Sequence, residues 1–201
     1  MFSHVPLTSP RHRRRRLGAA LLAFWLGLAG LAPATPAAAA GAPLAASEEK
    51  VQAAYLHKFL NYAEWPPVSF PQPDTPYVIG VAGDDTVADE LARIAAGRSV
   101  NNRGVIVKRL LPGDAVNDLH VLYIGRNERA RLGQWLRQVK GKPVLTVTAA
   151  EGALEQGCII NFRTVDDRVR FEVSADAAEQ SGLRLNSRLY SVAMNVVKGN
   201  R

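Results

Sequence analysis

The sequence predicts an α/β fold: a single compact domain in which helices flank a mixed sheet, with a C-terminal β-hairpin and a closing helix. Two observations carry this prediction. Between residues 77 and 147, short apolar runs alternate with helical periods, which is the pattern of strands joined by helices. In the last third of the chain, four residues separate two strand-like runs, and such a spacing favours an antiparallel hairpin.

The first 40 residues are typical of a secretory signal peptide. Five arginines, of which Arg16 is the last, precede the apolar run Leu17–Ala32, and the small-residue stretch Pro33–Ala40 follows. Basic, apolar and small segments in this order form a cleavable leader. The apolar run has 16 residues, whereas a helix needs roughly 20 to cross a bilayer. We expect cleavage near Ala40 and a soluble periplasmic chain that begins near Gly41.

The charge balance makes nucleic acid an unexpected partner. The full chain has 25 basic and 18 acidic residues, but the leader accounts for five of the basic ones and for no acid, so 20 remain against 18. A net charge of about +2 is ordinary for a domain of this size. No basic block follows Arg16 that could track a phosphate backbone. Residues 41–201 have the length of one domain.

Residues 47–64 predict an amphipathic helix. Ser47 is a candidate N-cap with two acidic residues behind it, where they suit the helix dipole. Trp65 precedes two prolines and ends the helix, because proline disfavours the helical conformation in the residue before it. One face of this helix is apolar, and it consists of Val51, Tyr55, Leu56, Phe59, Leu60 and Ala63.

The middle of the chain predicts an alternation of strands and helices. Helices are expected over Thr86–Ala96 and around Leu132–Val139, where apolar residues recur at positions i, i+3, i+4 and i+7. The strands are expected at Tyr77–Val81, Val105–Lys108, Val121–Ile124 and Val144–Val147.

The C-terminal third predicts the hairpin and the closing helix. The hairpin pairs Ile159–Arg163 with Arg168–Val173, and the second of these strands alternates charged and apolar residues, so one of its faces is expected to be buried. The closing helix is expected from about Ser187, with Gly199 past its end. Its inward residues would be Leu189, Val192, Ala193 and Val196.

No catalytic or metal-binding pattern is found. His57 and His120 have no acid or cysteine at ligand spacing, so we predict no metal, cofactor or catalytic residue. Asp84-Asp85 and Asp166-Asp167 are interpreted as turn residues. Gly80–Gly83 follows a strand and precedes a helix, but it lacks the remaining residues of a nucleotide-binding loop, so it predicts a close turn.

The only cysteine is Cys158, so no intrachain disulfide can form. It lies in a short apolar run that predicts a core strand, where a free thiol is usually buried and inert. The alternative is a thiol-dependent hydrolase in which His57 or His120 lowers the pKa of the thiol.

The sequence resembles the YfiR-like family of periplasmic regulatory proteins. The matching segments occur in the family's order over almost the whole mature chain, and they are Ala53–Pro66, Leu119–Ile124, Pro143–Val147, Gly157–Phe162, Val169–Val173 and Leu183–Leu189. Where the family often has a cysteine, before His120, this chain has Leu119. Control by a disulfide is therefore not expected here.

The resemblance implies a regulator that is not an enzyme. It would bind the periplasmic sensor domain of an inner-membrane diguanylate cyclase and repress it, and so lower cyclic-di-GMP synthesis and biofilm formation. A histidine kinase as the partner, and a homodimer, stay open. A small-ligand carrier is the other alternative: the aromatic residues of the first helix and the hairpin arginines could line a pocket.

A nearly neutral chain has little long-range steering, so we expect the partner to meet an apolar and aromatic centre with arginines at its edge. The candidates are Tyr55, Phe59 and Trp65 on the first helix and Arg168 and Arg170 on the hairpin. The alternative is that the three aromatic residues fill the core, which is the usual place of aromatic residues at helical spacing.

Overall fold

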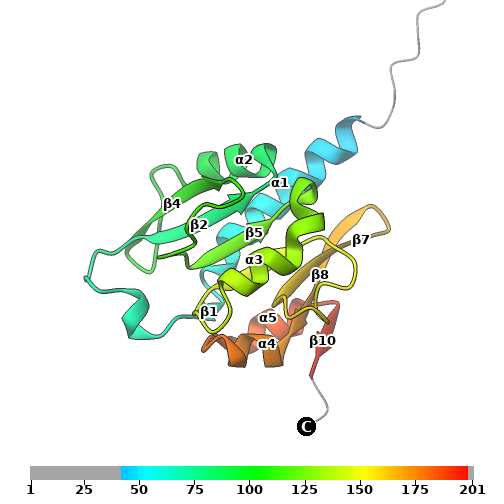
Figure 1. Ribbon diagram of the computed structural model, residues 1–201. Coiled ribbons are helices and arrows are strands. Elements are labelled where there is room, and N and C mark those ends of the chain that lie inside the picture. Colours follow the sequence, from blue (N-terminus) through cyan, green and yellow to red (C-terminus); the bar gives the residue numbers. More distant parts are fainter. Residues whose placement is uncertain (1–41, 199–201) are drawn as a thin grey trace, which may run out of the picture. The chain divides into compact units, whose positions relative to one another are not determined.

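The computed structural model describes residues 42–198 (Figure 1). Its main element is an eight-stranded sheet in the order β10-β8-β7-β6-β5-β2-β4-β3. The five strands β4, β2, β5, β6 and β7 are parallel to one another. Strand β8 is antiparallel to β7, and β3 is antiparallel to β4. The sheet is therefore mixed, and the predicted α/β class is confirmed. The signal peptide predicted over residues 1–40 lies outside the described residues.

The strands of this sheet are β2 (Tyr77–Ala82), β3 (Ser99–Val100), β4 (Arg103–Leu110), β5 (Val121–Ile124), β6 (Leu145–Thr148), β7 (Ile160–Val165), β8 (Arg168–Ser174) and β10 (Asn195–Val197). A separate pair is formed by β1 (Ala63–Glu64) and β9 (Arg184–Leu185). The helices are α1 (Ala42–Phe59), α2 (Asp85–Ala95), α3 (Leu132–Gln138), α4 (Ala175–Gln180) and α5 (Ser187–Val192), and two 3-10 helices are η1 (Pro67–Ser69) and η2 (Arg126–Arg131).

Two hydrophobic cores lie on the two faces of the sheet, because the central parallel strands are apolar on both sides. In β5, Tyr123 belongs to the core that α1 and α2 cover, and Leu122 belongs to the core that α3 covers. Leu56 of α1 and Trp135 of α3 are fully buried anchors of these two cores. Figure 1 shows α1 and α2 on one side of the sheet and α3 on the other.

The chain reverses its direction of winding at β2. It goes from β2 to β4 on one side and then returns to β5 on the other side, so the carboxyl ends of β2 and β5 form a topological switch point. Gly125 donates its N–H to the carbonyl oxygen of Ala82 at 2.7 Å, and a Cβ on Gly125 would lie 2.5 Å from the Cβ of Asp84. The two loops are in close contact here, and the close turn predicted at Gly80–Gly83 is confirmed, with Gly83 at φ +70°.

Of the two aspartate pairs, Asp166-Asp167 forms the predicted turn, whereas Asp84-Asp85 begins helix α2. Asp84 is the N-cap of α2, and its side chain accepts a hydrogen bond from the backbone N–H of Val87 at 3.0 Å. Asp166 and Asp167 form the two-residue turn between β7 and β8, with φ values of 47° and 56°. Two successive left-handed residues match the right-handed twist of a hairpin.

Predictions at both ends of the described chain are wrong. Helix α1 spans Ala42–Phe59, so Ser47 lies inside it and is not its N-cap. The helix also ends before Trp65, and residues 63–64 form strand β1. The closing helix α5 ends at Val192, and residues 195–197 form β10, which pairs in parallel with β8. Pairing with β10 provides hydrogen-bond partners for backbone groups at the edge of β8, which would be unpaired if the helix were longer. The N–H of Met194, just before β10, donates to the carbonyl oxygen of Phe171 in β8 at 2.8 Å.

Candidate functional site

The aromatic face of α1 packs inside the molecule. Phe59 and Tyr55 contact Phe171 of β8 with ring centroids 5.2 and 5.5 Å apart, and both also contact Phe162 of β7. Only 1% of Phe59 is exposed, and Tyr55 is partly buried. These rings join α1 to the inner face of the hairpin, so the core interpretation holds for Phe59.

Trp65 is also a core residue, with 8% of its surface exposed. Its indole Nε1–H donates a hydrogen bond to the carbonyl oxygen of His120 at 3.1 Å. Phe59 and Trp65 thus present almost no surface to a partner. Of the five candidate residues, Arg168, Arg170 and part of Tyr55 remain accessible.

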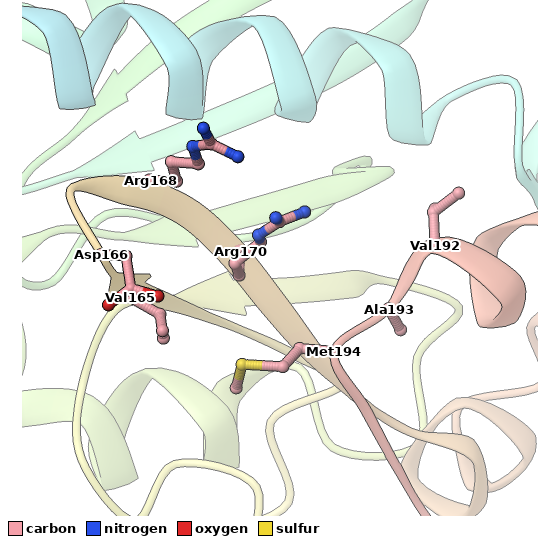
Figure 2. A pocket seen from close by; sticks show the side chains of 7 residues that line it. All are labelled: Val165, Asp166, Arg168, Arg170, Val192, Ala193 and Met194. Carbon is pink, nitrogen blue, oxygen red and sulfur yellow. The ribbon is translucent and has the colours of Figure 1, made fainter.

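The structure does not bring Tyr55 and the two arginines together. Along β8, Phe171 points to the α1 side and contacts Tyr55, and successive strand residues point to opposite faces. Arg168 and Arg170 therefore lie on the other face of the hairpin. Figure 2 shows both arginines on the same side of β8.

The outer face of the hairpin is a charged surface with apolar neighbours. Arg170 lies directly opposite Arg163 on β7, and Arg168 lies opposite Val165. Like charges directly opposite each other in a sheet are unfavourable. Among the described residues no ion pair is recorded for Arg168 or Arg170, so these guanidinium groups are available to an outside carboxylate.

An open groove of about 520 Å³ lies between the hairpin and the segment that joins α5 to β10 (Figure 2). We call it the hairpin groove, and its lining residues are Val165, Asp166, Arg168, Arg170, Val192, Ala193 and Met194. Val192 is 60% exposed and Met194 is 46% exposed. The groove therefore combines uncovered apolar side chains with two cationic ones.

Sequence reasoning missed Val192 and Met194 as surface residues. It placed Val192 on the inward face of a helix, because Leu189, Val192, Ala193 and Val196 recur at positions i, i+3, i+4 and i+7. The backbone of Ala193 is extended, with ψ 142°, and this change of direction turns both side chains outward beside the hairpin. The apolar spacing of the sequence does not indicate that the helix ends at Val192.

The thiol does not form a reactive centre. Cys158 is fully buried, and its Sγ donates to the carbonyl oxygen of Ile160 at 3.3 Å. Burial raises the pKa of Cys158 to about 12, so the thiol is protonated at neutral pH and is not a nucleophile. The prediction of a buried cysteine is confirmed, and the thiol-dependent hydrolase has no support at this residue.

The two histidines of the described residues lie in different environments. His120 is buried, and both of its ring nitrogens are engaged with backbone groups. His57 is only partly exposed, and burial lowers its pKa. In the part of the chain that the structure describes, no three residues of the types His, Cys, Asp and Glu gather as metal ligands do.

The comparisons with known proteins identify the family. A family model described as YfiR/HmsC-like matches residues 49–194, which includes every residue of the hairpin groove. No curated protein matches the chain. Within residues 42–198, none of the helices combines the length and the apolar character needed to span a bilayer. The chain therefore belongs to the YfiR/HmsC-like family, whose members are periplasmic regulators of cyclase signalling.

Proposed function

We propose that this protein represses an inner-membrane signalling protein, a diguanylate cyclase, by binding the periplasmic sensor domain of that enzyme through the hairpin groove. Family membership supports a regulatory role in the periplasm. The observation that carries the choice of surface is the groove itself, in which exposed Val192 and Met194 adjoin two arginines without recorded ion pairs.

The chemistry of the groove sets the chemistry of the partner. Affinity in a protein interface is concentrated in a few residues that lose water completely, with polar contacts around them. Val192 and Met194 would supply the apolar centre, and Arg168 and Arg170 would bind carboxylates at its edge. Methionine suits this position because its flexible side chain adapts to a partner's surface. The matching surface on the cyclase is an apolar patch flanked by aspartate or glutamate.

Repression follows if the protein binds one state of the sensor domain more tightly than the other. Binding then moves the sensor population toward that state by the ratio of the two affinities. The cyclase remains in the conformation in which it does not make cyclic-di-GMP. The protein has no contact with the nucleotide, because synthesis takes place on the cytoplasmic side of the membrane.

The experiment is deletion of the gene, followed by complementation with exported variants. Deletion should raise cyclic-di-GMP and surface attachment, and the wild-type copy should restore both. Met194→Asp and the double variant Arg168→Glu/Arg170→Glu should fail to restore them, because each removes one half of the groove's chemistry. Loss of a residue at the centre of an interface lowers affinity by about thirtyfold or more.

Leu111→Asp and Arg93→Glu are matched controls. Leu111 is exposed and follows β4, at the far end of the strand order from β10, and Arg93 lies on α2. Both controls should complement fully. If deletion leaves cyclic-di-GMP unchanged, and the exported protein captures no cyclase from membranes, the proposal is wrong. Capture of a histidine kinase in place of a cyclase would also contradict it.

We also propose that the working form begins near Gly41 after export. Intact-mass measurement of the protein in a periplasmic extract should give a chain without the arginines at 11–16. A membrane-bound product that retains them would contradict cleavage.

A further inference from the structure

A second hollow, of about 350 Å³, lies at the carboxyl ends of β5 and β6. Three arginines line it, namely Arg126, Arg129 and Arg163, and we call it the arginine pocket. Arg126 and Arg129 are three residues apart in the 3-10 helix η2, and side chains at this spacing lie on the same side of such a helix. Arg163 reaches the pocket from β7.

Two of these arginines are held in position. A terminal nitrogen of Arg129 donates to the carbonyl oxygen of Ala149 at 2.9 Å. A terminal nitrogen of Arg126 lies 2.7 Å from a carboxylate oxygen of Glu48 on α1. Guanidinium groups that are already oriented lose less freedom when they bind an anion.

The third arginine has no recorded ion pair among residues 42–198. Arg163 lies directly opposite Arg170 across the hairpin, so its nearest cross-strand neighbour repels it. An anion in the pocket would relieve this repulsion. The pocket also contains Glu48 and Glu151, which leaves one positive charge more than the carboxylates neutralise.

The position in the fold agrees with ligand binding. In open α/β sheets, ligands bind outside the carboxyl ends of the strands near the topological switch point. The switch point between β2 and β5 is closed by Gly125 and Asp84. One strand further along, Ala149 and Ala150 follow β6 and line the hollow.

We propose that the arginine pocket binds a small anionic ligand that carries a carboxylate or a phosphate group. Arg129 and Arg163 contact the anion directly. Arg126 contacts the anion after its ion pair with Glu48 is broken, so the ligand competes with the Glu48 carboxylate for this arginine. This site shares no residue with the hairpin groove, and it does not depend on the proposed partner.

The test is calorimetric titration and thermal unfolding of the full exported protein with inorganic phosphate and with citrate, each against sodium chloride of equal ionic strength. At least one anion should bind and raise the melting temperature. Binding of phosphate alone identifies a phosphate site, and binding of citrate alone identifies a carboxylate site. If neither binds beyond the chloride control, the proposal is wrong.

Variants separate this site from general attraction to a basic surface. Arg163→Gln and Arg129→Gln should each weaken binding about tenfold, the loss expected for one charge-assisted hydrogen bond. Glu48→Gln should strengthen binding by up to about fivefold, because it releases Arg126 from an ion pair that is partly exposed. Arg93→Gln, on the exposed surface of α2, is the control and should leave affinity unchanged. Unaltered affinity in Arg163→Gln, or weaker binding in Glu48→Gln, would overturn the proposal.

Discussion

His120 accepts a hydrogen bond at Nδ1 from the backbone N–H of Val78, at a distance of 3.1 Å. Its other ring nitrogen, Nε2, lies 3.1 Å from the carbonyl oxygen of Ser69. A carbonyl oxygen can only accept, so Nε2 carries the proton and the ring is neutral. The neutral imidazole thereby joins Ser69, at the end of η1, to Val78 in strand β2.

This arrangement predicts lower stability in acid. Burial lowers the pKa of His120 from its ordinary value of 6.5, and burial also lowers that of His57. The unfolded chain therefore takes up the proton first as the pH falls, and protonation favours unfolding. Above the ordinary histidine pKa, these two groups should not make the free energy of unfolding depend on pH. Below that pKa, the free energy of unfolding should decrease as the pH falls.

Urea unfolding at neutral pH and at about pH 5 measures this dependence. His120→Gln should show a weaker decline than the wild type, and His57→Gln provides the comparison for the second histidine. A decline that is unaltered in the double variant would assign the effect to other groups and contradict the prediction.

A buried pair links α1 to β5. The hydroxyl of Tyr123 donates to Oε1 of Gln52 at 2.7 Å, and both side chains are buried. Tyr123→Phe leaves the Gln52 oxygen without this donor, which should lower the free energy of unfolding by about 1–3 kcal/mol. Gln52→Leu with Tyr123→Phe removes both polar groups, so the double variant should be less destabilised than the sum of the two single variants. Additive effects in urea unfolding would show that the hydrogen bond has no net value.

Two glycines with similar backbone angles allow packing to be separated from backbone strain. Gly83 and Gly97 have φ values of 70° and 67°. A Cβ at Gly83 would lie 2.9 Å from the backbone nitrogen of Glu128, while a Cβ at Gly97 would meet no heavy atom within 4 Å. Gly97→Ala should lower the free energy of unfolding by about 1–2 kcal/mol, because alanine is unfavourable in the left-handed conformation.

Gly83→Ala should lower the free energy of unfolding by the same amount as Gly97→Ala and by about 1–3 kcal/mol more, because the new Cβ crowds Glu128. Chemical denaturation of the two variants gives the comparison directly. Equal losses in the two variants would mean that the contact at the switch point relaxes without cost.

The single thiol should be unreactive while the protein is folded. Because Cys158 is fully buried and burial raises its pKa to about 12, a disulfide reagent such as DTNB should label it only after denaturation. Reductant should leave the urea midpoint unchanged, since one cysteine cannot close a loop within the chain. Rapid labelling of the native protein, or a shift of the midpoint, would contradict the prediction and indicate pairing between molecules.

Local patterns in the sequence determined the central elements correctly. The predicted strand Val121–Ile124 has the same bounds as β5, and the hairpin forms around Asp166 and Asp167 as expected. Apolar strand runs, helical spacing and turn residues act within a few residues of each other, so they can be recognised without the rest of the chain. The burial of Cys158 followed from the same local evidence.

Interactions between distant segments determined the site. Phe59 and Trp65 are buried because they meet Phe171 and His120, which lie more than 50 positions away, and residue type alone does not distinguish a core aromatic from a surface one. The same is true of β10, which forms because β8 offers it a free edge. Helical periodicity around Val192 could not reveal that partner.

By itself, the sequence determined the fold class, the order of most strands and helices, and the resemblance to a family that the family model confirms. Only the tertiary structure decided which side chains share a surface: Val192 and Met194 join Arg168 and Arg170 in one groove, and Arg163 joins Arg126 and Arg129 in one pocket. The physical reason is that strand order and register set these neighbours, and both arise from burial and hydrogen bonding over long separations.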